Sequence, residues 1–114
     1  MSTLAVTIVQ QDIVWHDSKA NLALLSRELD ALESPVDLTV LPEMFTTGFS
    51  MDAETLAESI DGPSVNWLRA RALETGAAIC GSLIIRDAGR YYNRFIFMRP
   101  DGTYESYDKR HLFR

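Results

Sequence analysis

The sequence has one cysteine, Cys80, and no long hydrophobic run. A single cysteine excludes an internal disulfide and is typical of proteins from a reducing compartment. No segment approaches the roughly 18 apolar residues of a membrane-spanning helix. The first residues also lack the basic stretch and apolar core of a signal peptide. The sequence therefore predicts a cytoplasmic protein with no membrane partner.

Positive charge is scarce, with 11 Lys and Arg against 16 Asp and Glu, so the net charge is −5. This balance argues against a nucleic-acid partner. The one basic cluster, residues 109–114, is more typical of a solvated edge or an active-site rim than of a phosphate patch. His16 and His111 are isolated and have no metal-ligand spacing, so no zinc site is expected. No glycine-rich phosphate-binding motif is present.

The 114 residues suit one small domain or part of a larger one, and an apolar content of 46% is that of a globular chain. Short apolar runs at 4–9 and 38–41 predict two buried strands, and the run 77–85 predicts a third strand. A helix is predicted from Asp17 or Ser18 to residues 33–35, because leucines recur there every three or four positions. These leucines are Leu22, Leu25, Leu29 and Leu32.

A second helix is predicted from Gly62-Pro63, where Pro63 suits the first turn, to Gly76, which suits a helix end. Between the helices, residues 43–61 favour only one or two helical turns. Turns at 87–89 and 100–102 then separate strands at 91–98 and 103–107. The order β-α-β-α-β followed by a β-meander predicts an α/β fold, with a mixed sheet of about five strands and two main helices.

Glu43 comes directly after the predicted strand 38–41, at the carboxyl end where open α/β sheets form ligand crevices. A carboxylate in an apolar setting suits a general base. The alternative is a surface carboxylate at the start of a loop. Lys109 follows the last predicted strand and could stabilise an oxyanion. The alternative is an edge-strand lysine that discourages aggregation.

Two other side chains could take part in chemistry. Cys80 lies in the middle of a predicted strand, where a buried thiol is inert, so we expect it to be a core residue and not a nucleophile. Asn93 could orient a residue of the site, although an asparagine within a strand more often bonds a loop.

These residues give the chain a resemblance to the nitrilase superfamily of carbon–nitrogen hydrolases. The resemblance spans the whole chain through Leu41-Pro42-Glu43-Met44-Phe45, Tyr92-Asn93-Arg94, Pro100-Asp101-Gly102 and the segment 107–113. Within the superfamily the sequence is most similar to the omega-amidase branch, the 2-oxoglutaramate amidases. Residues 46–49 and 109–113 point to that branch.

The resemblance implies a catalytic triad of glutamate, lysine and cysteine that cleaves small linear amides without metal or cofactor. Glu43 matches the general base and Lys109 the oxyanion-stabilising lysine. The family cysteine follows a later strand, so the nucleophile is absent from these residues. The resemblance thus implies that residues 1–114 are the N-terminal portion of one hydrolase domain. The family fold is an α-β-β-α sandwich that forms homodimers.

Other functions stay open on the sequence alone. A ureido-acid hydrolase and the glutaminase part of a synthetase belong to the same superfamily. A non-catalytic α/β binding module would keep the fold without the chemistry. If the site is catalytic, Glu43 and Lys109 should meet at the carboxyl edge of the sheet.

Overall fold

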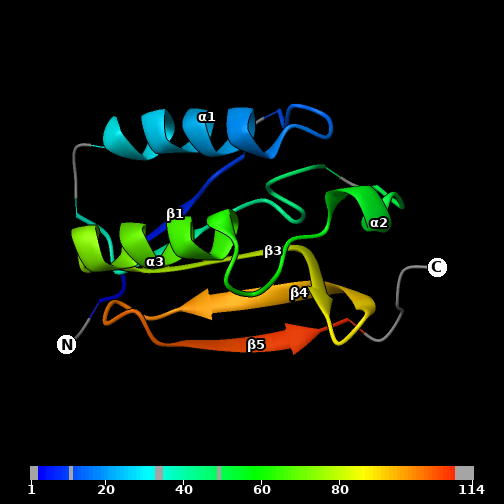
Figure 1. The fold of residues 1–114 in the computed structure, drawn as a ribbon. Helices are drawn as coiled ribbons and strands as arrows, with labels where there is room; N and C mark the ends of the chain where they lie inside the picture. Colours follow the sequence, from blue (N-terminus) through cyan, green and yellow to red (C-terminus); the bar gives the residue numbers. More distant parts are fainter. Residues whose placement is uncertain (1–2, 11, 33–34, 49, 110–114) are drawn as a thin grey trace.

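The computed structural model describes residues 3–10, 12–32, 35–48 and 50–109, which form one sheet with helices against it (Figure 1). The strands are β1 (Val6–Ile8), β2 (Leu38–Val40), β3 (Ala78–Asp87), β4 (Arg90–Met98) and β5 (Tyr104–Asp108). The helices are α1 (Ser18–Asp30), α2 (Ala53–Leu56) and α3 (Pro63–Thr75). The predicted element order and the two main helices are confirmed.

The sheet is mixed and has the strand order β1-β2-β3-β4-β5. The first three strands are parallel, whereas β3, β4 and β5 pair in antiparallel fashion. Two reversals bring β5 back to the direction of β3, so β2 and β5 run the same way. Their carboxyl ends therefore reach the same edge of the sheet, with the hairpin of β3 and β4 between them.

Local signals in the sequence set the helix ends. Asp17 caps α1, because its carboxylate accepts a hydrogen bond of 3.0 Å from the amide of Ala20. Pro63 lies in the first turn of α3, and Gly76 ends that helix with φ of 71°. A left-handed residue at this position suits glycine, which has no Cβ to clash. Both predicted helix starts are thus confirmed.

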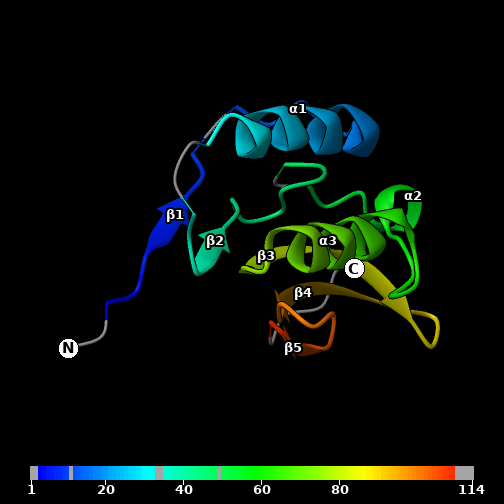
Figure 2. The ribbon, with the colours of Figure 1, turned by 90° about the vertical axis from the view of Figure 1, so that its left-hand side faces the viewer.

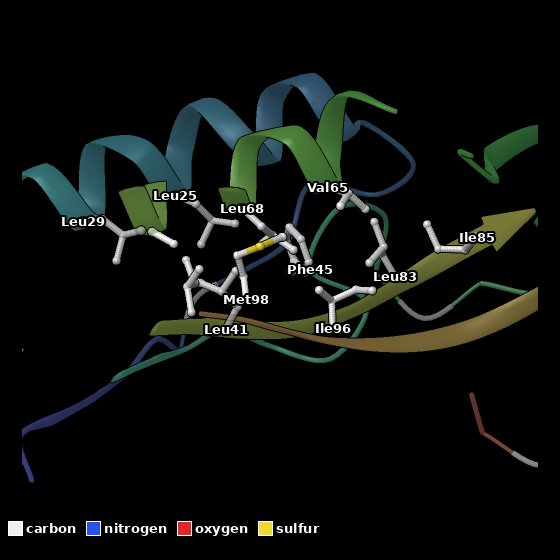
Figure 3. Packing of buried hydrophobic residues seen from close by; sticks show 12 residues of the cluster. Leu25, Leu29, Leu41, Phe45, Val65, Leu68, Leu83, Ile85, Ile96 and Met98 are labelled. Carbon is white, nitrogen blue, oxygen red and sulfur yellow. The ribbon is translucent and has the colours of Figure 1, made fainter. Parts of the chain in front are cut away.

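The hydrophobic core lies between the helices and one face of the sheet (Figure 3). Figure 2 shows α1 and α3 on the same side of β3, β4 and β5. The core side chains come from α1, α3, the segment after β2, and every second residue of β3 and β4. The largest fully buried ones are Leu25, Phe45, Leu68, Leu83, Ile85, Ile96 and Met98.

Two sequence predictions about burial are wrong. The run 4–9 was expected to be a buried strand, but within the described part of the chain β1 pairs only with β2, and Ile8 is 72% exposed. An edge strand is exposed because it has a neighbouring strand on one side only. The apolar composition of residues 4–9 does not reveal that position. Leu32 was placed on the buried helix face, yet α1 ends at Asp30 and Leu32 is exposed. Residues 33 and 34, where that helix was expected to end, lie outside the described residues.

The opposite face of the hairpin is not covered by any helix that the structure describes. It carries Phe95 and Tyr107, which are cross-strand partners on β4 and β5 and are both exposed. Among the described residues, no helix has the length and apolar character needed to cross a membrane.

Candidate active site

The loop that carries Glu43 is bound to β3 on both sides of the glutamate. The amide of Leu41 donates to the carbonyl of Cys80 at 2.8 Å. The amide of Met44 donates to Oγ of Ser82 at 3.0 Å, and the amide of Phe45 to the Ser82 carbonyl at 3.1 Å. Met44 has a φ of 53°, which is uncommon for a residue with a side chain. The two bonds to Ser82 hold the chain in this turn, directly after Glu43.

Close packing with Gly81 also fixes this loop. A Cβ at Gly81 would lie 2.9 Å from Cδ1 of Phe45 and 3.1 Å from Cβ of Leu41. A side chain at this position would therefore push the loop away from β3. Glycine allows the backbone of β3 to approach the segment on which Glu43 is held.

Lys109 is positioned by the pairing of β5 with β4. Its main-chain N–H donates to the carbonyl of Asn93 at 3.1 Å, which extends the ladder past the end of β5. The preceding residue, Asp108, accepts two hydrogen bonds from the guanidinium of Arg94, at 2.6 and 3.0 Å. Asp87 accepts a further bond from Arg94 at 3.2 Å. Asp108 first, and Asp87 after it, raise the pKa of the buried Arg94 guanidinium.

Glu43 and Lys109 meet as the sequence led us to expect. Nζ of Lys109 forms an ion pair with Oε1 of Glu43, although the two residues are 66 positions apart. Nδ2 of Asn93 donates to the same oxygen at 3.3 Å. The lysine contact lowers the pKa of Glu43, burial opposes this shift, and the Asn93 bond adds to the lowering. Glu43 is therefore a carboxylate at neutral pH, and the expectation that an apolar setting disfavours its charged form is wrong, because Lys109 outweighs burial.

The pair lies at a hollow of about 340 Å³ on the sheet face away from the helices. Its lining is mostly apolar, with a few polar groups, which is the usual character of a small-molecule site. The lining residues are Leu41, Glu43, Gly81, Ser82, Asn93, Phe95, Tyr107 and Lys109. A second hollow of about 290 Å³, near Leu29, Thr39 and Arg71, contains neither Glu43 nor Lys109.

Cys80 is separate from this chemistry. Its side chain is buried in β3 and does not line the hollow, and burial raises the pKa of its thiol. A thiol of this kind is a poor nucleophile.

The two histidines lie apart from each other in the sequence, and His16 bonds Oγ of Ser50 at 2.7 Å. His111 and the rest of the basic cluster, residues 110–114, lie outside the described residues.

Sequence reasoning did not identify two side chains that shape the site. Ser82 holds the amide of Met44, and no local pattern signals that contact. Asn21 binds Val14 and the carbonyl of Thr46, which joins the loop before α1 to the loop after Glu43. A polar residue among the apolar positions of α1 was the available signal. Asn93 was considered as an orienting residue, and the structure does place it against Glu43.

Comparison with known proteins relates this arrangement to one family. Residues 5–114 match the family model described as carbon-nitrogen hydrolase. The chain is 43% identical to omega-amidase YafV of Escherichia coli K12 and 45% identical to that of Yersinia enterocolitica. Each match covers all of this chain but 44% of the relative. The chain therefore spans less than half the length of these relatives.

A solved structure is similar in fold as well as in sequence. It is XC1258 from Xanthomonas campestris, described as a CN-hydrolase superfamily protein with an arsenic adduct in the active site. The TM-score is 0.91 and the identity 43%, over 99% of this chain and 43% of that one. The five-stranded mixed sheet is thus the one found in this superfamily.

Proposed function

Because the chain belongs to the carbon–nitrogen hydrolase family, we propose that it contributes the base and the oxyanion-stabilising cation of an omega-amidase-like enzyme. The observation that carries this proposal is the ion pair of Glu43 with Lys109 at the lined hollow. The substrates are small linear amides, as the names of the omega-amidase relatives suggest. No cofactor is required by the proposed chemistry.

In the proposed reaction Glu43 moves protons while a cysteine makes and breaks the bonds to carbon. The thiol gives its proton to the Glu43 carboxylate, and the thiolate attacks the amide carbonyl. Lys109 stabilises the oxyanion that forms. The C–N bond then breaks, and the leaving nitrogen takes the proton from Glu43 and departs as ammonia. Water, deprotonated by Glu43, releases the acid from the thioester.

The nucleophile of this proposal lies in a longer protein, of which residues 1–114 form the N-terminal portion. The match to 44% of the length of its relatives supports this division. The buried, unreactive setting of Cys80 supports it as well. The exposed Phe95 and Tyr107 beside the hollow would then be covered by the rest of the domain. On this proposal, purified residues 1–114 release no ammonia from amides.

The test is ammonia release from 2-oxoglutaramate by the full-length protein and by its Glu43→Gln variant. Glutamine keeps the shape of Glu43 but cannot accept the thiol proton. Loss of a general base lowers kcat by roughly 10²- to 10⁴-fold. Glu54→Gln, at an exposed position on α2, is the matched control and should keep full activity. Near-normal turnover by Glu43→Gln would refute the proposed role.

The expected homodimer and cytoplasmic location are further parts of the proposal. Support for the dimer comes from the family resemblance, and support for the location comes from the single cysteine. Light scattering of the full-length protein tests the first, and fractionation of the cells that make it tests the second. A monomeric active enzyme would exclude the dimer as a requirement.

A further inference from the structure

Asn93 lies on the face of β4 that carries the hollow. Ile96 and Met98 of the same strand belong to the helix-covered core. Because successive side chains of a strand point to opposite faces, Asn93 and Phe95 point away from the helices. Asn93 is paired across the sheet with Ile84, which is also buried. Asn93 is itself only 9% exposed. It is therefore a polar group in a position that an apolar side chain normally fills.

The orientation of the Asn93 amide follows from its partner. Oε1 of Glu43 belongs to a carboxylate, which accepts hydrogen bonds and donates none. The amide atom that faces it at 3.3 Å must therefore be Nδ2. A half-turn of the amide would replace this bond with the repulsion of two oxygens. The bond to Glu43 thus fixes the direction of the whole side chain.

This direction leaves the other end of the amide unsatisfied. Oδ1 of Asn93 is buried and has no hydrogen-bond partner among the described residues. Buried polar atoms without partners are rare in folded proteins and destabilise them. An apolar side chain at position 93 would remove this penalty. The stability of the fold therefore does not account for an asparagine here, whereas the contact with Glu43 does.

We propose that Asn93 is a positioning residue, whose side-chain amide holds the Glu43 carboxylate in its charged form with one oxygen free for proton transfer. Lys109 and Asn93 both contact Oε1, and no described residue bonds Oε2. Oε2 is thereby left to the proton of an attacking thiol. This inference rests on the proposed function for its catalytic meaning, but the contact it invokes can be tested without catalysis.

The direction of the Glu43 pKa agrees with this role. The bond from Asn93 lowers that pKa, in addition to the larger effect of Lys109. Removing the Nδ2–H donor should therefore raise the pKa of Glu43. The main-chain carbonyl of Asn93 bonds the amide of Lys109 and stays in every variant. Side-chain variants thus leave the placement of Lys109 intact.

The experiment compares Asn93→Leu and Asn93→Asp with the wild type in the full-length protein. Titration of ¹³C-labelled glutamate carboxyls by NMR gives the pKa of Glu43, whose signal is the one missing in Glu43→Gln. We expect that pKa to rise in both variants. Thermal unfolding should show Asn93→Leu to be as stable as the wild type or more so. The kcat for 2-oxoglutaramate should fall roughly 10- to 100-fold with KM unchanged, as for loss of a hydrogen bond to a charged group.

Asn66→Leu is the matched control, because Asn66 is an exposed asparagine on α3 that bonds Asp61 and Arg69. It should alter neither the Glu43 titration nor kcat. An unchanged Glu43 pKa in both Asn93 variants would overturn the inference, as would a loss of kcat explained fully by lost stability. A Glu43→Gln variant with normal activity would instead refute the proposed function and leave the titration result standing.

Discussion

Two regions of this molecule each bury one asparagine, and they use it in opposite ways. Asn21, on α1, is fully buried and all its hydrogen bonds are made within the fold. Its Oδ1 accepts from the amide of Val14 at 2.7 Å, and its Nδ2 donates to the carbonyls of Val14 and Thr46 at 2.8 and 2.7 Å. Asn93, on β4, makes one side-chain bond, to Glu43, and leaves Oδ1 without a described partner.

The comparison separates a structural from a functional reason for burying a polar group. A fully satisfied amide joins two loops and adds stability, since its partners, the buried Thr46 carbonyl among them, would otherwise lose their bond. A half-satisfied amide adds little stability, and its one bond is directed at a reactive carboxylate. The two regions should therefore respond differently to the loss of the amide, the first in stability and the second in the chemistry of Glu43.

The largest effect on stability is expected for Asn21→Leu. It leaves the buried carbonyl of Thr46 and the part-buried amide and carbonyl of Val14 without their partner, so the free energy of unfolding should fall by about 2 kcal/mol or more. Urea denaturation of the full-length protein measures this change. Asn21→Asp keeps the acceptor for Val14 but sets a buried carboxylate against the carbonyls of Val14 and Thr46, so it should lose at least as much. A loss below about 1 kcal/mol for Asn21→Leu would remove the contrast with Asn93.

Ser82→Ala should affect both stability and activity, because Ser82 belongs to the region of the hollow and also bonds the backbone. The buried amide of Met44 loses its partner, which costs about 1–3 kcal/mol. Release of the turn after Glu43 should also lower kcat. Ser106→Ala, at an exposed position of β5, is the control and should be neutral. A normal kcat with the expected stability loss would show that Glu43 does not depend on this turn.

The dependence of the unfolding free energy on pH should change in Asn93→Leu and not in Asn21→Leu, although the difference is small. The pKa of Glu43 is lowered in the folded state from 4.5, so its contribution is fully present above that value. The contribution is lost as pH falls through the lower folded pKa. Asn93→Leu should weaken this acid dependence slightly, and Asn21→Leu should leave it unchanged. Unfolding free energies measured from about pH 3 to pH 6 test the difference, which partial exposure of the pair keeps small.

The smallest effect on turnover is expected for Cys80→Ala. The Cys80 thiol is buried in β3 and lies outside the lining of the hollow, so amidase activity of the full-length protein should stay within a few-fold of wild type. A stability loss of about 1 kcal/mol is expected for the lost sulfur. Replacement of the cysteine that the proposal places beyond residue 114 should instead abolish turnover. A fall in turnover of several orders of magnitude in Cys80→Ala would show that Cys80 is the nucleophile and that our assignment is wrong.

Much of the fold was predictable, because its elements depend on nearby residues. Asp17, Pro63 and Gly76 mark helix ends through contacts within a few positions. The leucines that predicted α1 recur with the helical period, and Leu25 and Leu29 are indeed buried. Exposure of β1 was not predictable in the same way. Whether an apolar strand lies at the edge or the centre depends on which strands pair, and residues 4–9 do not encode that locally.

The sequence by itself determined the order of the elements, the helix ends and the family resemblance, which pointed to Glu43 and Lys109. The sequence also led us to expect that Glu43 and Lys109 meet, but only the tertiary structure decided the bonds of Asn21 with Thr46 and of Asn93 with Glu43, across 25 and 50 positions. The physical reason is strand register. Neighbouring residues of β4 point to opposite faces, so a shift by one position would turn Asn93 toward the helices and Arg94 toward Glu43. The pairing of β3, β4 and β5 fixes that register, and with it the candidate site.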